Sequence, residues 1–163
     1  MALVDSENEK LARAAVIALS QTSDSRIRDK ALDLLNRKQS QHGLKQCVDL
    51  LQNSLQPEDI ETIEQAFFSG RFFQHLDKQQ KERELHSCTI SLRSMVKHFP
   101  DKRWTPLLLW FYEHGPCSFC RTNIVKLLIS LNSATPELLE ECRDDCCEKT
   151  RELVGVKESE SEL

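Results

Sequence analysis

The stretch Trp104–Leu128, with the sequence WTPLLLWFYEHGPCSFCRTNIVKLL, decides the fold of this chain. An apolar segment of helical character is interrupted by Gly115 and Pro116, and a second amphipathic segment follows at once. Since a Gly-Pro pair does not continue a helix, the two segments are predicted to be helices that fold back on each other. The sequence therefore indicates an antiparallel helical hairpin.

Similar helical segments occur on both sides of this hairpin. A shorter copy follows at 136–154, with a turn at 143–145 between its two helices. Apolar residues at helical spacing also predict a hairpin over 7–38, a helix from Leu44, a helix that begins near Pro57, and the longest helix over 77–99. The polar stretch 78–83 at the start of the longest helix is expected to stand in solvent. About eight or nine helices are predicted in all.

The composition favours helix throughout. Pro and Gly are few, and the alternation of apolar and polar residues that marks strands is missing almost everywhere, which predicts an all-α fold. The longest apolar run, Leu107–Tyr112, is far too short to span a membrane, and the amino-terminal residues do not resemble a signal peptide. We expect a cytoplasmic protein without a membrane partner.

The length fits one domain, predicted over 1–155, and the acidic segment 156–163 is expected to be a disordered tail. Residues 1–136 carry 18 Lys and Arg against 16 Asp and Glu, whereas residues 137–163 carry 4 against 10. Neither part is basic enough for a general phosphate-binding surface, so nucleic acid is not expected as a partner.

Three segments resemble the HEAT repeat, in which an acidic or capping residue, a β-branched residue, an Arg and a small or apolar residue recur in the second helix of a hairpin. The resemblance implies a right-handed α-solenoid of stacked antiparallel hairpins, an armadillo-type superhelix, in which the Arg bridges neighbouring repeats. Residues 104–155 also resemble the carboxyl-terminal part of uncharacterised bacterial HEAT-like proteins, a resemblance that brings no activity with it. The three sets are Asp24, Ile27, Arg28 and Ala31; Cys117, Cys120, Arg121 and Ile124; and Cys147, Thr150, Arg151 and Val154.

Five of the seven cysteines are predicted at helix ends on one edge of the last two hairpins. In a stack of hairpins these ends come together, and neighbouring helices lie about 8–10 Å apart. Cysteine side chains that converge from adjacent helix ends can hold zinc. The candidate ligands are Cys117, Cys120, Cys142 and Cys147.

The leading interpretation of these thiols is packing, because cysteine behaves as a small hydrophobic residue and no paired metal motif is present. On this interpretation the protein has no cofactor, and zinc is the alternative. A third interpretation is a redox or regulatory thiol, for which Cys117 is the candidate since it precedes a helix and lies near Arg121. His75, His86 and His98 are interpreted as surface or packing residues, because no partner is visible at a metal-binding interval.

The sequence shows no catalytic motif, which favours a non-enzymatic protein–protein interaction module, a scaffold or adaptor that binds another protein or a peptide. Trp110 and Tyr112 are the candidates for the partner contact, because their helix is apolar on more than one face. The alternative is a metal- or redox-responsive protein that uses the cysteine edge. A DNA glycosylase of HEAT-like fold would need a basic groove, and no basic helix face of sufficient length is present.

Overall fold

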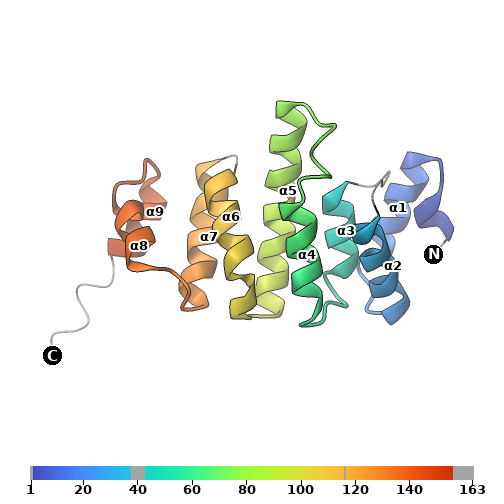
Figure 1. Ribbon diagram of the computed structural model, residues 1–163, viewed down its shortest axis with the longest axis horizontal. Coiled ribbons are helices and arrows are strands. Elements are labelled where there is room, and N and C mark those ends of the chain that lie inside the picture. The colour runs from blue at the N-terminus through green and yellow to red at the C-terminus, as the bar shows by residue number, and fades with distance from the viewer. Residues whose placement is uncertain (1, 38–42, 116, 156–163) are drawn as a thin grey trace.

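The computed structural model describes residues 2–37, 43–115 and 117–155, and all regular secondary structure in this part of the chain is helical. The predicted tail 156–163 lies outside the described residues. The predicted all-α class and the number of helices are confirmed (Figure 1). The described elements are η1 (Ala2–Asp5), α1 (Glu9–Leu19), α2 (Ser25–Asn36), α3 (Leu44–Leu51), α4 (Asp59–Phe68), α5 (Lys78–His98), η2 (Lys102–Trp104), α6 (Thr105–His114), α7 (Ser118–Ser130), α8 (Pro136–Arg143) and α9 (Glu148–Gly155).

The helices stand side by side in a row that follows the chain from its amino to its carboxyl end (Figure 1). The odd-numbered helices contact one another in succession, α1 with α3, α3 with α5, α5 with α7 and α7 with α9. Among the even-numbered helices, α2 contacts α4 and α4 contacts α6. Contacts of α2 with α3, α6 with α7 and α8 with α9 join the two sets. The described chain thus forms an odd layer and an even layer.

Side-chain caps determine where several helices begin. Asn8, Asp24 and Thr135 accept hydrogen bonds from backbone N–H groups in the first turns of α1, α2 and α8, as preferred capping residues do. At α5, Asp77 and Gln80 form a reciprocal capping box. These bonds satisfy N–H groups that have no partner within the helix, so the capping residues fix the helix starts.

A continuous apolar core lies between the two layers. The ring of Phe67 on α4 meets the ring of Phe111 on α6 edge to face, with centroids 5.0 Å apart. Trp104 is fully buried, and its indole N–H donates to the carbonyl oxygen of Phe99 at 3.0 Å. The only polar atom of the Trp104 side chain therefore has a hydrogen-bond partner.

The first turns of α5 extend beyond the neighbouring helices (Figure 1). The segment 78–83 is exposed on all sides, whereas Leu85, Cys88 and Leu92 further along the helix are buried. The predicted solvent-exposed start of this helix is therefore confirmed. Among the described residues, no helix is long and apolar enough to cross a lipid bilayer.

Two of the arginines in the predicted repeat frame form ion pairs with a following element. Arg28 on α2 pairs with Asp59 on α4, with Nη2 2.7 Å from Oδ1 and Nε 2.8 Å from Oδ2. Arg121 on α7 lies 3.1 Å through Nε from Oδ2 of Asp145, in the turn between α8 and α9. Arg151 instead donates to the carbonyl oxygen of Asp145 within its own hairpin. Arg28 and Arg121 thus each connect their own helix with a later element of the chain.

The predicted register of the three segments is wrong in one respect. Arg121 and Arg151 lie on α7 and α9 in the odd layer, whereas Arg28 lies on α2 in the even layer. Because the layers alternate along the chain and four helices, α3 to α6, lie between α2 and α7, these two helices belong to opposite layers. The pairing of α2 with α3 corresponds to that of α6 with α7 and of α8 with α9. The segment around Arg28 therefore occupies the first-helix position, although its local sequence pattern matches the other two.

Candidate functional site

Cys117 and Cys120 lie together at the start of α7. Cys117 is the N-cap residue, and its Sγ accepts a hydrogen bond from the backbone N–H of Cys120 at 3.4 Å. The two sulfur atoms are 3.3 Å apart, because residues three positions apart share one face of a helix. Cys117 is partly exposed and Cys120 is buried. Both are free thiols.

A histidine from a different helix completes this group. Nδ1 of His86, on α5, lies 3.1 Å from Sγ of Cys120 and 3.7 Å from Sγ of Cys117. Within the described residues, His86, Cys117 and Cys120 are the one set of three or more potential metal ligands whose donor atoms converge, all within 4.8 Å of one another. We call this set the thiol–histidine cluster.

The structure gives His86 two partners that were not visible in the sequence. Its partners lie 31 and 34 positions further along the chain, so no local spacing reveals them. The contact depends on α5 and α7 being neighbours in the odd layer. One sequence signal did exist: His86 is adjacent to the buried Leu85 and two residues before the buried Cys88, at the edge of the buried stripe.

The predicted four-cysteine set is divided by the structure. Cys142 is buried, and its Sγ lies 3.8 Å from the hydroxyl oxygen of Tyr112. Cys147 Sγ instead accepts a hydrogen bond from the hydroxyl of Thr122 at 3.5 Å. Cys117 and Cys120 are thus brought together, whereas Cys142 and Cys147 have partners elsewhere. The expectation of one site made of all four is corrected, because α8 and α9 place the latter two toward different neighbours.

The surroundings raise the pKa of two of these thiols and lower the pKa of a third. Burial, reinforced by the neighbouring Cys117, raises the pKa of Cys120 to about 12. Burial likewise raises the pKa of Cys142. The hydrogen bond from Thr122 lowers the pKa of Cys147. Without a metal, the Cys120 thiol is therefore protonated near neutral pH, and Cys147 has the greater tendency to form a thiolate.

The two aromatic candidates for a partner contact differ in their exposure. Tyr112 is only 8% exposed, so it belongs to the core and its proposed partner contact is corrected. The burial of its ring raises the pKa of the Tyr112 phenol. Trp110 is partly exposed: it stacks on the ring of His114 at 4.6 Å and lies 6.4 Å from the ring of Phe68 on α4. Trp110 remains a candidate.

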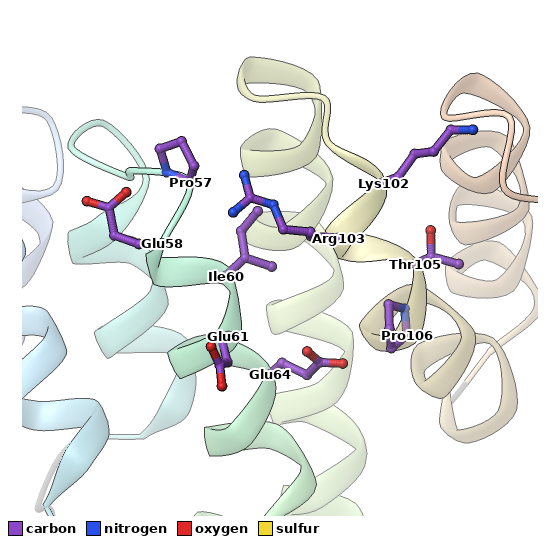
Figure 2. A pocket seen from close by; sticks show the side chains of 9 residues that line it. All are labelled: Pro57, Glu58, Ile60, Glu61, Glu64, Lys102, Arg103, Thr105 and Pro106. Carbon is purple, nitrogen blue, oxygen red and sulfur yellow. The ribbon is translucent and has the colours of Figure 1, made fainter.

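A groove lies between the start of α4 and the segment that enters α6 (Figure 2). Its volume is about 680 Å³. Arg103 extends from η2 toward α4, and Glu64 extends from α4 toward Pro106 (Figure 2). We call it the α4–α6 groove. Its lining residues are Pro57, Glu58, Ile60, Glu61, Glu64, Lys102, Arg103, Thr105 and Pro106.

The charges in this groove are unequally neutralised. Glu58 is 2.9 Å from the guanidinium of Arg28, and Arg103 is paired with Asp101 at 2.7 Å. The pKa of Glu64 is raised by burial and, to a lesser extent, by the charge of Glu61. The wall formed by α4 therefore carries two neighbouring carboxylates that repel each other.

Comparison with known proteins identifies no relative: no family model, no curated protein and no solved structure matches this chain.

Proposed function

We propose that this protein is a non-enzymatic binding module, a short HEAT-like α-solenoid whose α4–α6 groove takes up a segment of another protein. The observation that carries the proposal is the groove between two neighbouring helices of the even layer, whose α4 wall carries Glu61 and Glu64. The Phe68–Trp110 pair lies further along the same two helices. Grooves between helices commonly receive peptides or helices, which need no catalytic group.

The geometry of α4 and α6 supports a binding surface longer than the groove itself. Glu61, Glu64 and Phe68 follow one another at intervals of three and four residues, which keeps them on one face of α4. Pro106 and Trp110 are four residues apart on α6. The Phe68 and Trp110 rings meet at 6.4 Å, so the two faces that begin at the groove converge on an aromatic pair.

The exposure of Phe68 and Trp110 also supports a binding surface on α4 and α6. The Phe68 side chain is 48% exposed although it neighbours Phe67, which is buried. An exposed phenylalanine beside a partly exposed tryptophan forms an apolar patch of the kind that marks interaction sites. Trp and Tyr side chains are also frequent among the residues that contribute most to binding energy.

The charges favour a basic partner. A Lys or Arg side chain placed between Glu61 and Glu64 would relieve their repulsion and compensate for the desolvation of the Glu64 carboxylate. Apolar contacts are available on the Phe68–Trp110 pair. The proposed partner segment therefore combines basic residues with at least one large apolar residue.

Selection from a random peptide library displayed on phage, with the purified full chain as bait, tests this function. We expect enriched peptides that carry a basic residue near a large apolar residue. Synthetic versions should lose at least tenfold in affinity for a Glu61→Lys/Glu64→Lys variant and retain affinity for Glu152→Lys, an exposed site on α9. Selected peptides without basic residues, or equal binding to all three proteins, would reject the proposal.

A further inference from the structure

We propose that His86, Cys117 and Cys120 bind one Zn²⁺ ion, which joins α5 to the start of α7. This inference goes beyond the proposed binding function and does not depend on the α4–α6 groove. It rests on three donor atoms that come from two helices and face a common point. Imidazole nitrogen and thiolate sulfur are the ligands that zinc prefers in proteins.

The distances between the donor atoms are close to those of a zinc site. Zn–S bonds of about 2.3 Å and Zn–N bonds of about 2.0–2.1 Å in a tetrahedron place two sulfurs about 3.8 Å apart and a sulfur and a nitrogen about 3.6 Å apart. The corresponding distances here are 3.3 Å for the two sulfurs, and 3.1 and 3.7 Å from His86 Nδ1 to Cys120 and Cys117. Each is within about 0.5 Å of the ideal separation, an adjustment that side-chain rotation supplies.

The identity of the α7 cap is a second, independent observation. Asn8, Asp24, Asp77 and Thr135 cap α1, α2, α5 and α8, and all are residues with strong oxygen acceptors. The α7 cap is Cys117, whose sulfur is a weak acceptor and meets the N–H of Cys120 only at 3.4 Å. Capping alone does not explain a cysteine at this position, whereas metal ligation does.

The same N–H···S contact suits a metal-bound thiolate. Two thiolates balance the charge of Zn²⁺, so the buried Cys120 sulfur would carry no net uncompensated charge when the metal is bound. The backbone N–H of Cys120 then donates to the Cys117 sulfur, and a donated hydrogen bond of this kind orients a ligand and stabilises its charge.

The remaining coordination position has access to solvent. His86 and Cys117 line a shallow hollow of about 500 Å³ on the outer side of the cluster. Three protein ligands with one open position leave room for a water molecule as the fourth ligand. The hollow also provides the path by which the metal enters. Its other lining residues are Gln79, Glu82, Arg83 and Ser87.

The experiment uses the full chain, reduced and treated with a chelator, and titrates it with Co²⁺ as a spectroscopic probe of tetrahedral zinc sites. We expect one Co²⁺ per chain, with the d–d absorption of tetrahedral cobalt and thiolate-to-metal charge-transfer bands, all lost when Zn²⁺ displaces the cobalt. Zinc should protect two thiols from alkylation. At a free Zn²⁺ concentration of about 100 times Kd, it should raise the Tm by about 5–10 °C.

Three variants decide the assignment. His86→Ala and Cys117→Ser alter partly exposed side chains, so both should fold, as circular dichroism will check, and both should lose the cobalt bands and the zinc-dependent rise in Tm. Cys146→Ser removes an exposed thiol outside the cluster and should bind as the parent does. Binding that survives in His86→Ala or Cys117→Ser would overturn the proposal. So would the absence of tetrahedral cobalt bands in the reduced parent protein.

Discussion

The guanidinium group of Arg28 on α2 donates two hydrogen bonds, of 2.7 and 2.8 Å, to the carboxylate of Asp59 on α4. The Asp59 side chain is only 2% exposed, and its Oδ2 also accepts the backbone N–H of Gln56. The pair connects two successive helices of the even layer and holds the loop that precedes α4. An ion pair with one fully buried member is difficult to replace, because loss of either partner leaves a desolvated charge.

We therefore expect Arg28→Met to lower the free energy of unfolding by about 3 kcal/mol. Arg26→Met, two residues earlier, provides the control, because the Arg26 side chain is 81% exposed and its ion pair with Asp24 is at the surface. Urea denaturation followed by circular dichroism measures both. Similar midpoints for the two variants would show that the Arg28–Asp59 pair contributes no more than a surface ion pair.

Two adjacent phenylalanines on α4 should separate stability from binding. Phe67 is buried against the rings of Phe73 and Phe111, so Phe67→Ala should destabilise the fold by about 3–5 kcal/mol. Phe68 is 48% exposed, so Phe68→Ala should lower stability by less than about 1 kcal/mol. Thermal melts of the two variants measure this difference in stability. Titration with a library-selected peptide should show that Phe68→Ala weakens binding while the fold persists, and unchanged binding would exclude the Phe68–Trp110 pair from the site.

The acidic wall of the groove predicts a pH-dependent gain in stability. The pKa of Glu64 is raised in the folded protein by burial and by Glu61, so the folded state holds the proton more tightly than the unfolded state does. The favourable contribution of protonated Glu64 is complete below the ordinary glutamate pKa and is lost as the pH rises through the raised value. We expect Glu64→Gln to raise the Tm at pH 7 and to leave it nearly unchanged at a pH below the ordinary value.

Glu152→Gln on α9 is the matched control for this measurement, because Glu152 is exposed. Its Tm should differ from that of the parent equally little at the two pH values. If Glu64→Gln lowers the Tm at pH 7, the carboxylate makes a favourable contact in the folded state, and the repulsion argued for the groove is wrong.

The free thiols should differ widely in alkylation rate. Cys147 is partly exposed and its pKa is lowered by the hydrogen bond from Thr122, which favours the reactive thiolate. Burial raises the pKa of Cys47 to about 12 and also raises the pKa of Cys88, so both should react only on unfolding. Peptide mass spectrometry after timed exposure to iodoacetamide gives the rates. Thr122→Val should slow the labelling of Cys147, and labelling of Cys47 at a comparable rate would contradict the assignment.

The sequence predicted those parts of the fold that depend on neighbouring residues. Gly115 ends α6 and Asp77 begins α5, because turn and capping preferences act within a few positions. The layer that each helix joins depends on packing between distant segments. The sequence pattern therefore placed the Arg28 segment in the second helix of a hairpin, whereas α2 packs on α3 and takes the first position. The candidate site was likewise predictable from the sequence only in part. The proximity of Cys117 and Cys120 follows from helix spacing, whereas the approach of His86 requires the contact between α5 and α7.

Because the start of α5 extends beyond its neighbours, the two parts of this helix should differ in amide hydrogen exchange rate. The helix has 21 residues and is about 31 Å long, whereas its neighbour α3 has 8 residues and is about 12 Å long. Amide hydrogens in 78–83 should exchange quickly with solvent deuterium, because this part of the helix is exposed on all sides, and those after Leu85 should exchange slowly. His86 lies just inside that boundary. A metal bound there should shift the onset of slow exchange toward the amino-terminal end, so the exchange profile of one helix would record whether the cluster is occupied.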